Sequence, residues 1–174
     1  MDRLARPLGR SPLFARGSFA LVSLAKIPSR MPSCYFLAVC AGSSLDQQTN
    51  NASLFHLVEQ VNVAPGHLPE PGRRLPLEVH CYFRLQPDEH GQEIEMRFAL
   101  LAPTGLETYT DPTSHRAASA RLRTRHVGLS FPPDLGYYEL RVDFRVAGGP
   151  WQRGPSSWPL AILEARPPRP QVTH

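Results

Sequence analysis

The sequence predicts an all-β protein, an antiparallel β-sandwich of seven to eight strands of the immunoglobulin-like or C2-like type. Apolar and polar residues alternate at every second position in several stretches between residues 33 and 165. Turns rich in proline and glycine separate these stretches, and none of them has the longer period of an amphipathic helix. Strands that are apolar on one side bury it when two sheets pack face to face, so the pattern predicts a sandwich.

The chain of 174 residues predicts one domain, residues 33–165, between two tails. Residues 1–32 form a predicted disordered leader, and residues 1–30 hold six of the 19 basic residues against a single acidic one. Three interpretations of this leader stay open: sequence upstream of a true start near Met31, a disordered tail, or a targeting peptide. Residues 166–174 form a tail of proline and arginine that is also predicted to be disordered.

Each expected strand of the domain is bounded by turn-forming residues. The strands 75–86 and 93–103 alternate cleanly, and the polar connection between them predicts a β-hairpin. In the first of the two, one face is predicted to carry Glu78, His80, Tyr82 and Arg84, and the opposite face Leu77, Val79, Cys81, Phe83 and Leu85. The expected strands are 33–42, 54–64, 75–86, 93–103, one within 104–110, 121–131, 136–146 and 158–165.

The strand from Gly136 to Val146 has the strongest pattern in the chain. Its even-numbered residues from Tyr138 onward are all apolar, and they are predicted to form one wall of the core. Its odd-numbered residues from Glu139 to Arg145 alternate in charge. This alternation predicts a solvated face with ion pairs to neighbouring strands.

Two short motifs lie within this order of strands: LAPTG at Leu101–Gly105, and Gly136-Tyr137-Tyr138 at the start of a late strand. Together with the strand order over roughly residues 33–165, they resemble a family of small uncharacterised bacterial proteins. That family is described as a domain of unknown function with an immunoglobulin-like or C2-like sandwich. The resemblance implies a bacterial protein of this fold and implies no established activity.

Three cysteines, Cys34, Cys40 and Cys81, make an odd number with no Cys-x-x-Cys spacing. Cys34 and Cys40 lie six residues apart in one expected strand, which separates them by roughly 20 Å and excludes a disulfide between them. Reduced, buried thiols are therefore predicted, and they favour a cytoplasmic location. No segment approaches the run of apolar residues that a membrane-spanning helix needs.

No arrangement of residues typical of catalysis or cofactor binding occurs in the sequence. There is no Gly-x-Ser-x-Gly elbow and no glycine-rich phosphate loop. No two histidines are spaced by two, as ligands on one strand face would be, or by four, as on a helix. We therefore expect no catalytic residue, no metal and no cofactor. An enzyme with a loop-built site that uses His56, His80 or His126 is retained as an alternative.

The arginines at 121, 123 and 125 share one strand face and form a stripe about 13 Å long. Such a stripe fits ion pairing, protection of an edge strand, or contact with an acidic partner. No aromatic residue interleaves with the stripe, which argues against nucleic acid. The proline-rich loop 65–74 and the loop around Trp151 offer further contact surfaces. The candidate partner residues are Arg73, Arg74, Arg116, Arg121, Arg123, Arg125 and Trp151.

These observations predict a non-catalytic binding or accessory module whose partner is a protein that contacts the arginines or the loops. A carbohydrate-binding module is the second alternative, with Trp151, Trp158 and Tyr109 as the sugar-stacking rings. That alternative requires the rings to lie exposed on one common surface.

Overall fold

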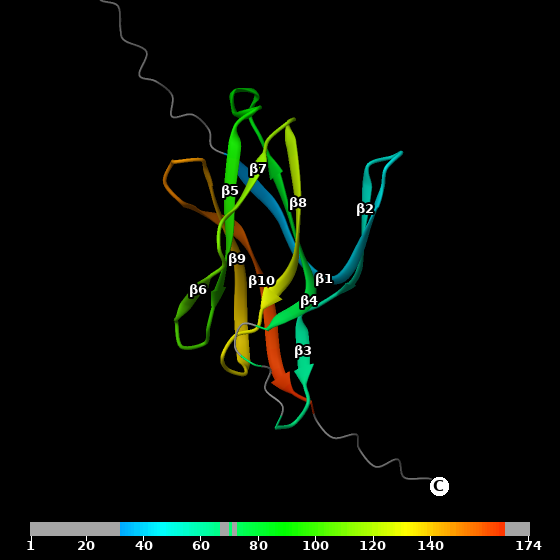
Figure 1. Cartoon of the computed structure of the whole chain (residues 1–174), viewed down its shortest axis with the longest axis vertical. Coiled ribbons are helices and arrows are strands. Elements are labelled where there is room, and N and C mark those ends of the chain that lie inside the picture. The colour runs from blue at the N-terminus through cyan, green and yellow to red at the C-terminus, as the bar shows by residue number, and fades with distance from the viewer. Residues whose placement is uncertain (1–31, 67–69, 71–72, 166–174) are drawn as a thin grey trace, which may run out of the picture.

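The computed structural model describes residues 32–66, 70 and 73–165, and within them the all-β prediction is confirmed (Figure 1). Ten strands form two sheets around a shared core, and these residues contain no α-helix. The predicted leader, apart from Pro32, and the predicted C-terminal tail lie outside the described residues. In the part of the chain that the structure describes, no helix is long and apolar enough to cross a membrane.

The first sheet has four antiparallel strands in the spatial order β2, β1, β4, β8. β4 lies inside this sheet and carries buried residues on both faces, whereas β2 and β8 are its edge strands. The four strands are β1 (Ser33–Asp46), β2 (Asn51–Leu57), β4 (Arg74–Arg84) and β8 (Arg121–Ser130).

The second sheet has six strands in the order β3, β10, β9, β5, β6, and β7 also pairs with β5. β7 pairs with the first half of β5, and β6 pairs with its end. β3 and β10 form a parallel pair. The six strands are β3 (Gln60–Val63), β5 (Glu93–Leu101), β6 (Glu107–Tyr109), β7 (Thr113–Arg116), β9 (Gly136–Val146) and β10 (Gln152–Glu164).

The inward-facing apolar residues of both sheets form one core. Phe83 of β4 and Phe144 of β9 meet edge to face across the sandwich, with ring centres 5.2 Å apart and an interplanar angle of 78°. The even-numbered residues from Tyr138 to Phe144 are buried, as the alternation predicts. Burial of large apolar side chains from both sheets is the main term that holds the two layers together.

The segment predicted as one strand, 54–64, is divided between the two sheets, because β2 ends at Leu57 and β3 begins at Gln60. Val58 lies at the crossing point. Its amide donates to the carbonyl of Val39 in β1, and its carbonyl accepts a hydrogen bond of 2.8 Å from the indole Nε1 of Trp158 in β10. The crossing point is therefore fixed to a strand of each sheet.

The predicted hairpin of 75–86 with 93–103 is wrong. β4 pairs with β1 and β8 in one sheet, whereas β5 pairs with β9, β6 and β7 in the other. The intervening segment contains a short 3-10 turn, η1 (Pro87–Glu89), and carries the chain from one sheet to the other. β4 pairs on both edges with strands distant in the sequence, and β5 pairs with the distant β9 on one edge and with β6 and β7 on the other. A local alternation pattern does not identify such partners.

Two segments form strands that the sequence did not predict. β7 lies within 111–120, which was expected to be a loop, and β10 begins at Gln152 rather than near Trp158. An irregularity in the pairing of β10 with β9 between Arg153 and Ser157 interrupts the alternation there. The interrupted alternation explains why the sequence pattern revealed only the second half of β10.

Gly154 lies inside this irregularity, and its replacement by alanine is expected to lower the free energy of unfolding by about 1–3 kcal/mol. A Cβ atom at Gly154 would lie 2.7 Å from the carbonyl oxygen of Val142 and 3.0 Å from its Cγ1. Gly42 of β1 provides the matched control, because a Cβ atom there meets nothing within 4 Å. Urea denaturation measures both variants, and equal stability of Gly154→Ala and Gly42→Ala would contradict the close packing at Gly154.

Candidate functional site

The outer face of the four-stranded sheet carries a group of arginines beside aromatic rings. In the register of β4 with β8, Tyr82 lies opposite Arg123 and Arg84 lies opposite Arg121. Paired residues point to the same side of a sheet, so these side chains form one surface. We call this surface the arginine face. Its members are Tyr35, Tyr82, Arg84, Arg121, Arg123 and Arg125.

Aromatic rings accompany the arginines on this face, contrary to the expectation from the sequence. The guanidinium of Arg84 lies 5.9 Å from the ring centre of Tyr35, and that of Arg123 lies 5.3 Å from the ring centre of Tyr82. Phe36 stacks on Tyr82 with ring centres 4.8 Å apart. The rings come from neighbouring strands, so the arginine segment alone does not reveal them. The outward position of Tyr82, which the alternation in its strand predicts, was the sequence signal for an aromatic ring on this face.

The β1–β2 hairpin stands beside this face (Figure 1). β1 pairs with β4 only as far as Cys40 and then continues as one arm of the hairpin. Arg123 donates a hydrogen bond from Nη1 to the carbonyl of Asn50 at the hairpin tip. Asn50, Arg121 and Arg123 line an open cavity of about 390 Å³ together with Ser119 and Ala120. The arginine face thus borders a recess between the hairpin and the start of β8.

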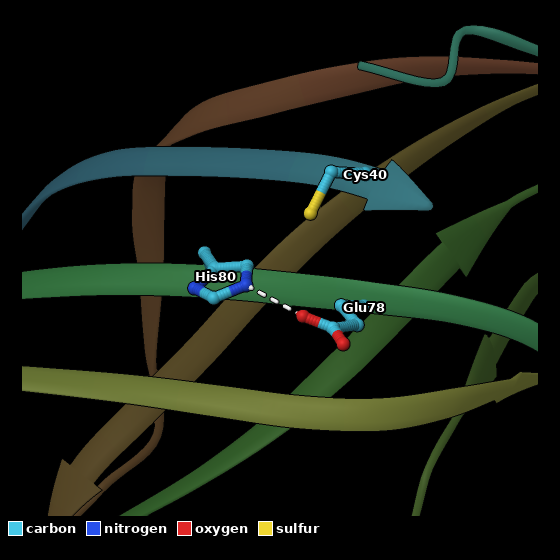
Figure 2. Close-up of side chains that lie close together, drawn as sticks. All are labelled: Cys40, Glu78 and His80. Atoms are coloured by element: carbon cyan, nitrogen blue, oxygen red, sulfur yellow. Dashed lines mark hydrogen bonds and ion pairs between the residues drawn. The ribbon is translucent and has the colours of Figure 1, made fainter. Parts of the chain in front are cut away.

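A buried polar cluster lies next to the arginine face, where Glu78 and His80 of β4 meet Cys40 of β1 (Figure 2). His80 Nε2 lies 3.2 Å from Glu78 Oε2, and Ser43 Oγ donates to the same oxygen at 2.6 Å. Arg125 Nη2 donates to the other oxygen, Oε1, at 2.5 Å. The carboxylate of Glu78 therefore joins three strands of the sheet through its hydrogen bonds.

The environment of Glu78 determines its ionisation. Burial raises the pKa of its carboxyl group, but the hydrogen bonds from Arg125, Ser43 and His80 outweigh burial and hold the pKa at about 2. Glu78 and His80 share one face of β4, as the alternation predicts. Both side chains point to the outer side of the sheet, yet the two residues are only 7% and 4% exposed.

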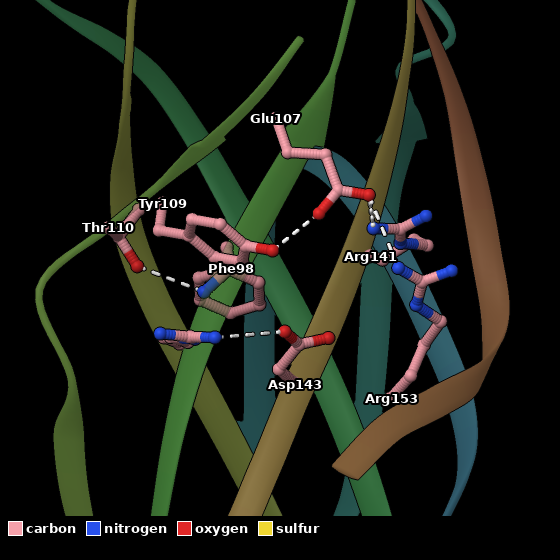
Figure 3. Close-up of polar contacts among 8 residues, drawn as sticks. Phe98, Glu107, Tyr109, Thr110, Arg141, Asp143 and Arg153 are labelled. Carbon is pink, nitrogen blue, oxygen red and sulfur yellow. Dashed lines mark hydrogen bonds and ion pairs between the residues drawn. The ribbon is translucent and has the colours of Figure 1, made fainter. Parts of the chain in front are cut away.

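The outer face of the six-stranded sheet carries four arginines that are each paired with a carboxylate. Figure 3 shows the pairs that Arg141 and Arg153 form with Glu107. Arg141 and Arg153 bind Glu107 Oε1 at 2.7 and 3.2 Å, and Glu107 also accepts a hydrogen bond from the hydroxyl of Tyr109. The hydroxyl of Tyr109 and the guanidinium of Arg141 lower the pKa of Glu107. The remaining pairs are Arg97 with Asp143 and Arg145 with Glu95.

Three of the four alternating charges of β9, those of Arg141, Asp143 and Arg145, form the predicted ion pairs with other strands. The face is not solvated as predicted, because Arg141 and Asp143 are only 6% and 7% exposed. The β6 segment supplies the carboxylate of Glu107 to Arg141. A pattern of alternating charge predicts which residues share one face of a strand. It does not predict whether other segments bury that face.

Trp151 belongs to this second face, with the guanidinium groups of Arg97 and Arg145 each 4.3 Å from its ring centre. Trp158 lies opposite Leu140 in the register of β10 with β9 and packs against the core. The two indoles therefore point to opposite sides of the same sheet. They do not form the common ring surface that the carbohydrate-binding alternative requires.

The other predicted contact residues are dispersed. Arg73 and Arg74 border an open cavity of about 440 Å³ that also contacts Phe131, and the loop that precedes them lies partly outside the described residues. Arg116 is exposed at the end of β7, opposite Glu93. The seven candidate residues therefore do not form one surface, and only those of β8 share the arginine face.

The three histidines of the enzyme alternative do not converge. His126 pairs with Val79 in the register of β4 with β8, so it faces the interior, whereas His80 faces the outer side of the same sheet. The ring of His126 lies 5.1 Å from that of Phe98, and burial lowers its pKa. His56 is exposed on the edge strand β2. No common cleft holds these three groups.

Comparison with protein-family models, with curated proteins and with solved structures gives no match to this chain. The resemblance to a family of bacterial proteins therefore stays a prediction. The fold and the two outer faces define a β-sandwich protein in which one arginine surface is paired with carboxylates and the other, among the residues that the structure describes, is mostly unpaired.

Proposed function

We propose that this protein is a non-catalytic β-sandwich binding module that holds an acidic, extended segment of a protein partner against the arginine face. The difference between the two arginine surfaces is the observation that supports this proposal. On the six-stranded sheet, Arg97, Arg141, Arg145 and Arg153 all bind carboxylates of the fold. On the arginine face, only Arg125 does so among the described residues.

The unpaired guanidinium groups are accessible. Arg84, Arg121 and Arg123 are exposed, and within the described ranges none of them forms an ion pair. Their cation–π and carbonyl contacts orient two of them without neutralising their charge. A surface of uncompensated positive charge attracts acidic partners and raises their rate of association.

The position of β8 fits an extended ligand. β8 is an edge strand, and no strand of the described residues pairs with its free side. Arg121, Arg123 and Arg125 repeat at every second residue, about 6.7 Å apart along the strand. Acidic residues at alternate positions of a strand added to this edge would have the same spacing. The free edge supplies main-chain hydrogen bonds, and the arginines supply selectivity for acidic side chains.

The contacts of the Tyr82 ring favour a protein partner over nucleic acid. Phe36 stacks on Tyr82, and Arg123 lies over the ring of Tyr82, so that ring is not free to stack on bases. Tyrosine and arginine together are typical of the contact surfaces between proteins. The cytoplasmic location and the bacterial origin expected from the sequence belong to this proposal as predictions.

The test is binding of a short fluorescent peptide in which glutamate alternates with threonine, compared with a peptide of the same composition whose glutamates are contiguous. We expect the alternating peptide to bind more tightly, and binding to weaken as salt screens the charges. The variant Arg121→Glu/Arg123→Glu should weaken binding by about tenfold or more, as measured by fluorescence anisotropy.

The control is Arg73→Glu/Arg116→Glu, which changes the net charge equally at exposed arginines outside the arginine face. This variant should bind nearly as well as the wild type. Equal losses in both double variants would contradict the proposed location of the site. Preference for a single-stranded oligonucleotide over both peptides would contradict a protein partner.

A further inference from the structure

Cys40 is a buried cysteine on the outer side of the four-stranded sheet. Cys34 and Cys81 belong to the apolar core between the sheets, but Cys40 does not, although it is also fully buried. Cys40 lies directly opposite Glu78 in the register of β1 with β4. Its thiol thus points toward the polar cluster rather than into the core (Figure 2).

We propose that Cys40, Glu78 and His80 form a zinc-binding site. One thiol sulfur, one carboxylate oxygen and one imidazole nitrogen of these residues all lie within 4.8 Å of one another. Sulfur, nitrogen and oxygen donors together suit Zn²⁺, which binds thiolate, imidazole and carboxylate groups in tetrahedral geometry. This inference does not rest on the proposed partner, because none of the three donor residues belongs to the arginine face.

The backbone positions the three donors. Glu78 and His80 are two residues apart in β4, so both side chains point to the same side, and Cys40 is held opposite Glu78 by the β1–β4 pairing. His80 Nε2 and Glu78 Oε2 are 3.2 Å apart, close to the separation of about 3.3 Å between two ligands on one tetrahedral zinc ion. Only a small movement is then needed to bring these two atoms to bonding distance of one ion.

The charges of the donors also match a divalent ion. Zn²⁺ would displace the proton of the Cys40 thiol, which leaves the site as H⁺, and would bind the thiolate beside the carboxylate of Glu78. The resulting thiolate and carboxylate carry two negative charges against the two positive charges of zinc. Arg125 now pairs with Glu78, but 53% of its side chain is exposed, so it has solvent into which it can withdraw.

Three protein ligands leave one position of a tetrahedral zinc ion for a fourth donor. Ser43 Oγ lies 2.6 Å from Glu78 Oε2, on the side of the cluster that faces the hairpin. Ser43 belongs to the part of β1 after Cys40, which pairs with β2 and no longer with β4. Bound zinc would therefore tie the β1–β2 hairpin to β4, and metal binding is expected to raise the thermal stability of the chain.

The experiment is titration of the full, chelator-treated chain with Co²⁺ and then with Zn²⁺ as competitor. We expect one ion per chain, a thiolate-to-cobalt charge-transfer absorption, and release of about one proton per ion near neutral pH. Cys40→Ser should abolish the charge-transfer absorption and weaken Zn²⁺ binding by about 100-fold or more. His80→Gln should weaken binding to a similar extent and keep the absorption of any residual complex.

Cys81→Ala is the matched control, since it removes a fully buried thiol of β4 that faces the core. It should retain both the absorption and the affinity. Circular dichroism verifies that each variant is folded. If a variant does not fold, the number of ions bound per wild-type chain and the charge-transfer absorption of its Co²⁺ complex still test the proposal. Absence of stoichiometric binding in the wild type, or binding that survives both Cys40→Ser and His80→Gln, would overturn the proposal.

Discussion

Truncation of Phe83 to alanine is expected to lower the free energy of unfolding by about 4 kcal/mol, the largest loss that we expect from any single substitution in this protein. Phe83 is completely buried, and its ring contacts that of Phe144 from the opposite sheet. Alanine would remove the apolar surface that joins the two layers and leave a cavity between them. The cost combines the lost transfer free energy with the cavity, because a close-packed core relaxes only in part.

The adjacent residue gives the control for Phe83. Tyr82 is also aromatic and lies in the same strand, but it points to the outer side and is only partly buried. Tyr82→Ala is expected to cost less than half as much as Phe83→Ala. Chemical denaturation measures the free energy of unfolding of both variants. The comparison requires that this free energy falls with denaturant concentration at the same slope in each. Similar losses would contradict the assignment of one face of β4 to the core.

Replacement of Glu107 by alanine is expected to lower the midpoint of thermal unfolding by roughly 10 °C. Glu107 is the ion-pair partner of Arg141, whose side chain is almost fully buried. Without the carboxylate, the guanidinium stays buried and loses its hydrogen-bonded counter-charge. A buried charge without a partner costs much more than the intact pair contributes, which makes the loss large.

Arg153→Ala provides the comparison for Glu107, because Arg153 binds the same carboxylate oxygen but 62% of its side chain is exposed. Loss of this exposed pair is expected to shift the unfolding midpoint by less than about 2 °C. Thermal unfolding followed by circular dichroism compares the two variants. Equal shifts would mean that Arg141 does not depend on Glu107 for its charge compensation.

The sequence reveals the faces of the strands better than their partners. The alternation from Tyr138 to Phe144 identifies core residues because the side-chain period of a strand is two, whatever sheet contains the strand. The same rule does not say which strand lies alongside. For that reason the hairpin of β4 with β5 was wrong, although the inward residues of both strands were identified.

The candidate sites depend on contacts between distant segments, which explains why the sequence predicted them only in part. The stripe of β8 is visible in the sequence because its arginines alternate within one strand. The cluster of Glu78 and His80 with Cys40 is not visible, because the β1–β4 register places Cys40 opposite Glu78, which is 38 residues away in the chain. The spacing of histidines alone does not reveal Glu78 and His80, although a carboxylate and an imidazole two residues apart share one strand face.

The position of bound peptide on the sheet tests the central claim most directly. Nuclear magnetic resonance of the ¹⁵N-labelled protein during titration with the alternating glutamate peptide reports every backbone amide and both indole Nε1 groups. We predict that the largest shift changes fall on Arg121–Val127 of β8 and on Tyr82 of β4, with Trp151 Nε1 unchanged. Shift changes centred on Trp151 or on the loop before Arg73, or none at saturating peptide, would contradict the proposed function.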